Sequence, residues 1–258
     1  MLRFKMVIVL CLAFLVSPML FSLNGSKDLE ASLAELPGLA DSPDHGTFVE
    51  LVKAIGDVYT DGKITIRVFP FARSVSNVIT GRADFHIPTV RNPMVDQTKL
   101  PYGTVTVPMG KVTLVIYSNS ANQISKKMLD AAIAGSKNFP YKIEIPGGIE
   151  NQFPFNGTSS NDVKQSLRKL ALGRIDALIW AQEEVDATLM SLKLGNIHRE
   201  FWTEFDDAII IPKGQEGDRL NMLLSAALTE LSKSGKLEAL HSKVHHAYDV
   251  WQPSDKGW

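Results

Sequence analysis

Only a few residues of the chain have the type and spacing that metal binding or catalysis requires. His241 and His245 lie four positions apart in a predicted helix, so their imidazoles would share one face, as metal ligation requires. No third ligand is apparent beside them in the sequence, and a solvent-exposed helix face is the interpretation that we favour. We therefore predict no metal site.

The remaining acid–base candidates do not form a catalytic set. His86 stands in a strand-like run between Phe85 and Ile87, where a half-buried structural histidine is expected. Neither a Ser-His-Asp order nor a pair of carboxylates at a catalytic spacing stands out. The other candidates that we weighed are His45, Glu144, Glu150 and Glu183. The sequence thus predicts no catalytic residue and no cofactor.

Composition and charge exclude some classes of protein. The 258 residues are 45% hydrophobic and 21% charged, which is typical of a globular protein. The formal net charge of −1 gives no electrostatic reason to expect nucleic-acid binding.

The N-terminus has the pattern of an export signal. Arg3 and Lys5 precede a long apolar run, and residues 1–26 are predicted to be a signal peptide. An uncleaved membrane anchor is the alternative, although Pro18 interrupts the apolar run. Cys11, the only cysteine, lies in this segment, so the exported part would contain none. These features predict a periplasmic protein.

One pattern occurs twice in the chain. The stretches ITGRADFHIP (79–88) and LALGRIDALIW (170–180) each pass from a helical run through Gly-Arg and an Asp into a strand-like run. Gly81 and Gly173 are predicted to end their helices in the left-handed conformation, which glycine adopts without steric cost. We interpret the repeat as architecture, with one such joint in each of two similar units.

Hydrophobic periodicity predicts helices and strands in alternation. Helical spacing is clear over residues 48–55, 163–170, 220–231 and 237–244. Strand-like runs cover residues 31–37, 64–70, 83–88, 112–118, 141–146, 175–180 and 207–212. The alternation predicts an α/β fold with largely parallel strands.

The order of several motifs resembles the extracellular solute-binding proteins of ABC importers, family 3. The first motif is the run from GTFVELV to ADFHIP (46–88), and the second is PTVRNPMVDQTKLPYGT (88–104). The third is the predicted closing helix pair (218–244), which breaks at Gly235. The resemblance covers residues 30–248.

The resemblance implies the type II periplasmic-binding fold, with two α/β lobes and two interlobe crossovers. Lobe one would comprise residues 27–108 and 210–258, and lobe two residues 109–209. A solute would bind in the cleft between the lobes, where strand ends and helix N-termini converge, and lobe closure would enclose it.

Five strand ends are predicted to face this cleft. They supply the candidate solute contacts Phe71, Arg73, Thr89, Arg91, Ser118, Asn119, Gly147, Gly148, Trp180, Gln182 and Glu183. Phe71 and Trp180 would form an apolar floor. Arg91 matches the arginine that holds the ligand carboxylate in the family's amino-acid binders, and a surface or interlobe ion pair is the alternative for it.

One departure from the family bears on the ligand. Amino-acid binders usually carry an Asp five positions after the Asp of the second-lobe joint, where it pairs with the ligand's ammonium group. Counted from Asp176, that position is Ala181. Because a buried ammonium group without a partner is costly, a standard α-amino acid is disfavoured. A carboxylate, an aromatic or otherwise mostly apolar solute, or a peptide-like molecule fits as well.

The predicted function is capture of a small-molecule solute for the membrane permease of an ABC importer, by a monomeric protein. A ligand-sensing partner of a membrane receptor is the first alternative. A dehydratase-like enzyme on the same fold is the second and less favoured one.

Overall fold

The computed structural model of the protein describes residues 28–135 and 139–258. The predicted signal peptide, residues 1–26, lies outside the described residues. Within the described ranges, no helix combines the length and apolar character needed to cross a membrane.

Nine strands form one sheet in the described part of the chain. Their order across the sheet is β2-β1-β3-β9-β5-β8-β6-β7, with β4 paired to β9. The strands are β1 (Leu29–Ala34), β2 (Ile64–Phe69), β3 (Phe85–Arg91), β4 (Gly103–Thr104), β5 (Gly110–Asn119), β6 (Ile143–Pro146), β7 (Thr158–Ser160), β8 (Ala177–Ala181) and β9 (Ile197–Ile211).

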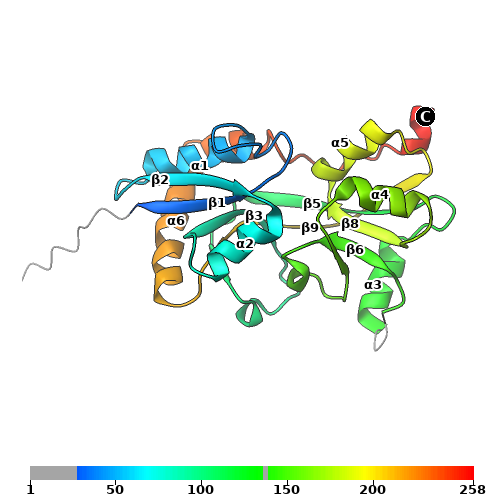
Figure 1. Ribbon diagram of the computed structural model, residues 1–258, viewed down its shortest axis with the longest axis horizontal. Helices are drawn as coiled ribbons and strands as arrows, with labels where there is room; N and C mark the ends of the chain where they lie inside the picture. Colours follow the sequence, from blue (N-terminus) through cyan, green and yellow to red (C-terminus); the bar gives the residue numbers. More distant parts are fainter. Residues whose placement is uncertain (1–27, 136–138) are drawn as a thin grey trace, which may run out of the picture.

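The helices divide between two lobes, as Figure 1 shows. Lobe one holds β1–β4 with α1, α2, α6 and α7, and lobe two holds β6–β8 with α3–α5, while β5 and β9 join the lobes. The helices are α1 (Thr47–Val58), α2 (Phe71–Ile79), α3 (Lys126–Gly135), α4 (Val163–Ala171), α5 (Gln182–Leu192), α6 (Gln215–Lys233) and α7 (Lys236–His241).

Strand pairing is parallel in the outer parts of the sheet and antiparallel in its centre. β1 pairs in parallel with β2 and β3, and β6 pairs in parallel with β7 and β8. β9 is antiparallel to β3 and β5, and β5 is antiparallel to β8. The prediction of largely parallel pairing is therefore correct for the outer strands and wrong for the centre, where the chain crosses between lobes.

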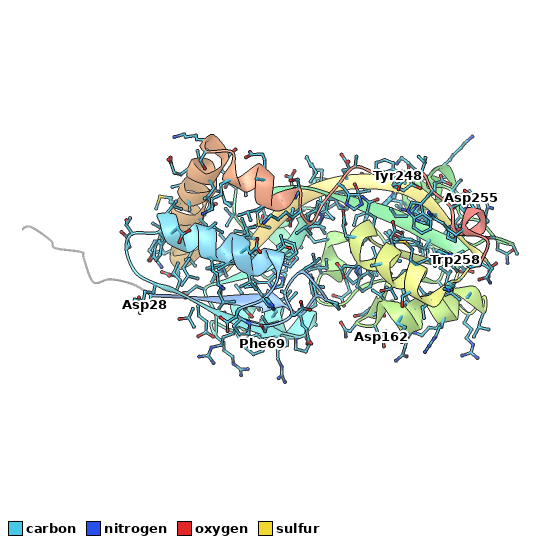
Figure 2. The ribbon with its side chains drawn as sticks, turned by 90° about the horizontal axis from the view of Figure 1, so that it is seen from above. Asp28, Phe69, Asp162, Tyr248, Asp255 and Trp258 are labelled. Carbon is cyan, nitrogen blue, oxygen red and sulfur yellow. The ribbon has the colours of Figure 1, made fainter. Side chains whose placement is uncertain are left out.

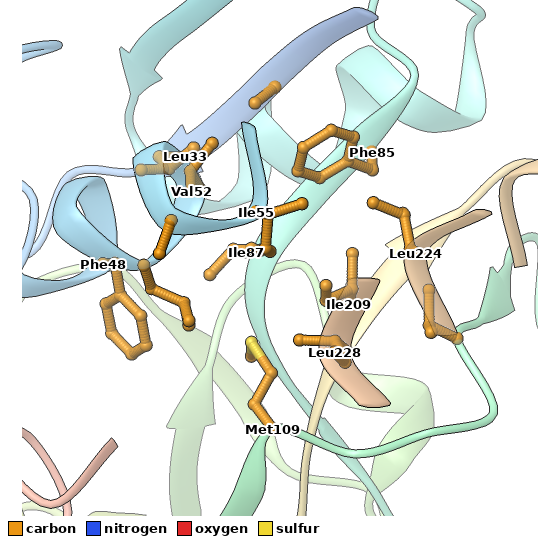
Figure 3. Close-up of a cluster of buried hydrophobic side chains, with 14 of the residues drawn as sticks. Leu33, Phe48, Val52, Ile55, Phe85, Ile87, Met109, Ile209, Leu224 and Leu228 are labelled. Atoms are coloured by element: carbon orange, nitrogen blue, oxygen red, sulfur yellow. The ribbon is translucent and has the colours of Figure 1, made fainter. Parts of the chain in front are cut away.

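The core of lobe one lies beneath α1 and α6 (Figure 3). Phe48, Val52 and Ile55 of α1 are buried at the spacing predicted from the sequence. Leu224 and Leu228 of α6 meet them from the other side. The predicted apolar faces of these two helices are thus confirmed.

The repeated Gly-Arg-x-Asp pattern forms the same joint in each lobe. Gly81 has a φ angle of 71° and Gly173 one of 67°, so both lie in the left-handed region. In each joint the backbone N–H of the next arginine donates to the carbonyl oxygen five residues earlier, at 2.7 Å in the first and 2.9 Å in the second. These bonds satisfy helix carbonyls that would otherwise lack a partner. The predicted glycine conformation is confirmed at both positions.

The aspartate of each joint fastens the following strand to its neighbour. Asp84 Oδ2 accepts from the backbone N–H of Glu30 at 2.7 Å. Asp176 Oδ2 accepts from the backbone N–H of Lys142, also at 2.7 Å. The two aspartates therefore have matching structural roles.

The C-terminal segment after α7 also passes between the lobes. Tyr248 and Trp251 pack against the apolar cluster of lobe two, and the guanidinium of Arg199 on β9 lies 4.2 Å from the centre of the Trp251 ring. Figure 2 shows Tyr248 and Trp258 on the lobe-two side. The predicted assignment of residues 210–258 to lobe one therefore needs correction for this tail, because Arg199 holds it on the other lobe.

Candidate functional site

A pocket lies between the lobes, where segments from both converge. Lobe one contributes the loop after β1, the first residues of α1 and α2, and the end of β3. Lobe two contributes the end of β6, the loop that follows it, and the junction of β8 with α5. Its volume of about 40 Å³ holds a few water molecules, so an organic solute would need the lobes to separate further.

A larger hollow of about 420 Å³ adjoins this pocket. The two share Leu36, Phe71, Pro146, Trp180 and Glu184 in their linings. Residues of both lobes thus border two neighbouring hollows, which a movement of the lobes would widen or close.

Most of the pocket wall is apolar. Phe48 and Phe71 come from lobe one, and Phe153 and Trp180 come from lobe two. Val112 and other aliphatic side chains complete the wall. Such a surface suits a solute with an apolar or aromatic body.

The inner end of the pocket carries charged groups. His245 lies between two carboxylates, with Nδ1 3.4 Å from Glu183 Oε1 and Nε2 3.3 Å from Asp207 Oδ2. Burial by itself would lower the pKa of His245, but the contacts with Asp207 and Glu183 outweigh it and raise the pKa to about 10. Burial would raise the pKa of Asp207, and the contacts with His241 and His245 lower it instead. Each ring nitrogen of His245 thus faces a carboxylate oxygen.

A further acid borders the pocket beside this group. Burial raises the pKa of Glu184 to about 7, although Trp180 Nε1 donates a hydrogen bond to its Oε2 at 2.8 Å. Glu184 thus changes its charge near neutral pH, and it fixes the indole ring of Trp180 at the pocket wall.

Four of the predicted contact residues line this pocket: Phe71, Thr89, Trp180 and Glu183. Gly147 lines the adjoining hollow. These residues share one place because β3, β6 and β8 all direct their carboxyl ends toward the cleft.

Two other predicted residues lie beside the pocket without lining it. A Cβ on Gly148 would come within 2.9 Å of the Ala72 Cα, so this glycine lets the two lobes approach closely. Gln182 is buried, and its Nε2 donates to the carbonyl oxygen of His246 at 2.7 Å. Both residues act at the contact between the lobes.

The structure places Ser118 and Asn119 at the far end of lobe two. Ser118 Oγ accepts from the backbone N–H of Ile124, and Asn119 Nδ2 donates to the carbonyl oxygen of Ala171 at 3.1 Å. The expectation that they face the cleft needs correction, because β5 runs antiparallel to β8. The carboxyl end of β5 therefore lies at the opposite edge of the sheet from that of β8.

Neither predicted arginine lines the pocket. Arg73 is exposed on α2. The guanidinium of Arg91 donates hydrogen bonds to Asp206 on β9 and to the carbonyl oxygens of Val105 and Thr106, just before β5. It therefore contacts the two segments by which the chain crosses between the lobes. The interlobe ion pair, which the sequence left open as the alternative for Arg91, matches this geometry.

Sequence reasoning missed several pocket residues. Asp207 and His245 form the charged end, and Phe48, Phe153 and Glu184 contribute to the wall. One signal was available for Asp207, since a charged residue stands directly before the apolar run AIII of a buried strand. The sequence offered no comparable signal for Phe48 or Phe153, which were indistinguishable from core residues.

Comparison with known proteins identifies the fold. No protein-family model matches the sequence, and no curated protein sequence matches it either. Solved structures do match. A histidine kinase sensor domain with similarity to periplasmic binding proteins has a TM-score of 0.64 and 18% identity, over 84% of this chain and 96% of that one. The protein EhuB in complex with hydroxyectoine has a TM-score of 0.62 and 15% identity, over 85% of this chain and 89% of that one. An ancestral arginine-binding protein bound to arginine has a TM-score of 0.61 and 16% identity, over 85% and 98%.

The chain has the type II periplasmic-binding fold. The pocket lies at the interface between the two lobes of this fold, and small-molecule sites are commonly found at such interfaces. The sequence-based prediction of a two-lobed α/β architecture of this type is confirmed.

Proposed function

We propose that the protein is a periplasmic solute-binding protein that captures a small organic molecule between its lobes and delivers it to a membrane transporter. The observation that carries this proposal is the pocket itself, which has apolar walls from both lobes and a charged inner end. Closure of two lobes around a solute buries both walls at once, so the closed form is stabilised only when a solute of matching shape is present.

The proposed solute has an aromatic or otherwise mostly apolar body. Phe71 and Trp180 stand on opposite lobes and would cover its two sides. Among the residues described, no arginine or lysine lines the pocket, so a carboxylate held by a guanidinium, as predicted for Arg91, has no support here. Ala181 lines the pocket, and so do the acids Glu183, Glu184 and Asp207, so an ammonium group would find a carboxylate there. A standard α-amino acid is disfavoured because its carboxylate would have no arginine or lysine partner in this lining.

A sensing role is the second candidate. It is favoured by the similarity to a histidine kinase sensor domain, which has the highest TM-score of the three structures compared above. In that role the solute-bound protein would contact a membrane receptor instead of a permease. The pocket and the solute would be the same, and only the partner would differ.

The first experiment is to identify the solute. The protein is purified without denaturation, and native mass spectrometry detects any small molecule that it carries. A panel of aromatic, apolar and amino-acid solutes is then added in a thermal-shift assay, in which a solute that binds only the folded state raises the unfolding temperature. We expect stabilisation by at least one mostly apolar solute.

Two results would overturn the proposal. One is the chemical conversion of a bound solute by the purified protein, because it would show an enzyme. The other is solute binding that is unaffected by alanine at Phe71 and at Trp180, because it would place the site elsewhere.

A further inference from the structure

Three side chains from separate elements meet at the inner end of the pocket. Asp207 belongs to β9, His241 ends α7, and His245 lies in the segment that continues to lobe two. The Nε2 atoms of His241 and His245 lie 3.6 Å and 3.3 Å from the same atom, Oδ2 of Asp207. One ligand atom of each residue lies within 4.8 Å of the other two. The histidine pair at i, i+4 spacing therefore has a third candidate ligand, Asp207, which the sequence did not reveal.

These atoms are buried and lack hydrogen-bond partners in the described part of the chain. Asp207 is fully buried, and neither of its carboxylate oxygens accepts a hydrogen bond. Nε2 of His241 and both ring nitrogens of His245 also lack a hydrogen bond of acceptable geometry. Because nearly all buried polar atoms in proteins are satisfied, so many unsatisfied atoms around one point indicate a place for an ion.

The distances fit tetrahedral coordination. Zinc binds imidazole nitrogen and carboxylate oxygen at about 2.0–2.1 Å, so neighbouring ligand atoms of a tetrahedral site are about 3.4 Å apart. The two measured separations from Asp207 Oδ2, 3.6 Å and 3.3 Å, lie on either side of this value. Two of the three separations therefore match a tetrahedral site, and the third, between the two histidines, is below 4.8 Å.

Two further residues support the arrangement. Glu183 Oε1 lies 3.4 Å from Nδ1 of His245, on the other side of the ring from Asp207. A carboxylate there holds the proton on Nδ1 and leaves Nε2 free to bind a metal ion, as is common in zinc sites. A Cβ on Gly110 would lie 2.4 Å from Nε2 of His241, so the glycine provides the space in which this imidazole lies.

We propose that Asp207, His241 and His245 form a binding site for a divalent first-row transition metal ion, with Zn²⁺ as its representative. Two imidazole nitrogens and one carboxylate oxygen suit these ions, whereas Ca²⁺ and Mg²⁺ prefer oxygen ligands alone. Three protein ligands leave one coordination position for water or for an atom of a bound solute. The proposal is independent of the proposed function, since it concerns the metal ion by itself.

The test uses the purified protein, stripped with a chelator and then dialysed. Isothermal titration calorimetry with Zn²⁺ should give one ion per chain. Co²⁺ should give the intense visible absorption of a tetrahedral site. His241→Ala is the main variant because the His241 side chain is 14% exposed, whereas Asp207 on β9 is fully buried. Removing His241 should therefore disturb the core less than removing Asp207. We expect it to lower the affinity at least 100-fold, and Glu183→Gln to lower it about 10- to 100-fold.

His246→Ala is the matched control, because His246 is an exposed histidine next to His245 and lies outside the cluster. It should leave the affinity unchanged, and circular dichroism should show that each variant is folded. The proposal is overturned if the wild-type protein binds less than one ion per chain, or if His241→Ala binds as tightly as the wild type. The cluster would then be an ion pair of protonated His245 with two acids. Solute binding measured with and without chelator keeps this outcome separate from the proposed function.

Discussion

Arg91 and Asp206 form an ion pair that ties β3 to the strand by which the chain returns from lobe two. Nη2 of Arg91 lies 2.7 Å from Oδ2 of Asp206, and its Nη1 donates to the carbonyl oxygen of Val105 at 2.9 Å. Lys111 at the start of β5 contacts the other oxygen of Asp206 at 2.6 Å. One carboxylate therefore connects lobe one with both strands that cross between the lobes.

The first prediction concerns this ion pair. Arg91→Ala should lower the free energy of unfolding by about 1–3 kcal/mol, because Asp206 and a backbone carbonyl lose charge-assisted hydrogen bonds. Solute affinity should stay within twofold of the wild type, since Arg91 does not line the pocket. Urea denaturation and the solute titration measure the two quantities. Arg73→Ala is the control, because Arg73 is exposed. It should change the free energy of unfolding by less than about 0.5 kcal/mol. A large loss of affinity with unchanged stability would return Arg91 to the binding site.

The second prediction concerns the aromatic wall. Phe71→Ala should weaken solute binding by about 1–3 kcal/mol, because one face of the solute would lose its apolar cover. Calorimetry with the solute identified by mass spectrometry gives the affinity. Phe69→Ala is a suitable control, since Phe69 ends β2 two positions earlier and does not line the pocket. Equal effects of the two substitutions would argue against a specific role for Phe71.

The third prediction concerns the pH dependence of stability. His86 is fully buried, and burial lowers its pKa from 6.5 to about 4. Between these two values the unfolded chain binds a proton that the folded chain does not, so stability contributed by His86 is lost as the pH falls. The loss should reach about 3 kcal/mol near pH 4. Denaturation of the wild type and of His86→Leu at pH 7, 6, 5 and 4 measures it. The variant should show a shallower decline, and parallel curves would disprove this role for His86.

The fourth prediction concerns the C-terminal tail. Arg199 lies 4.2 Å from the centre of the Trp251 ring, and its Nη1 donates to the carbonyl oxygen of Asp249 at 2.9 Å. Trp251→Ala should lower the free energy of unfolding by about 1–2 kcal/mol and expose the tail to proteolysis. Limited proteolysis followed by mass spectrometry locates the cleavage. Val250→Ala is the control, since Val250 is 77% exposed and should have little effect. A tail that resists cleavage equally in both variants would contradict the role given to Trp251.

Part of the site could be predicted because it depends on local order along the chain. Phe71, Thr89 and Trp180 each stand at or next to the end of a strand that was recognisable from its composition. Within each lobe the outer strands are parallel, so their carboxyl ends share an edge, and the edges of the two lobes meet at the pocket. The same reasoning failed for Ser118 and Asn119, because the sequence of neither strand shows that β5 runs antiparallel to β8.

The long strand β9 was recognised only in its last part. The sequence predicts a strand at 207–212, whereas β9 runs from Ile197 to Ile211. Arg199 and Asp207 are buried within it, and each breaks the alternation of apolar and polar residues that marks a half-buried strand. A buried charge in β9 needs a partner from another element. Asp186 on α5 is such a partner, because its carboxylate accepts a hydrogen bond from Arg199.

The sequence by itself determined the features that arise from neighbouring residues. Helix faces follow from a period of 3.6 residues, and the two glycine joints follow from a conformation that glycine adopts readily. Tertiary structure alone decided which distant side chains meet. It turned Arg91 toward Asp206, and it brought Asp207 to His241 and His245 from a separate element. The physical reason is that ion pairs and ligand sets depend on the distance between atoms in space, which strand pairing and the path of the tail fix and local sequence does not.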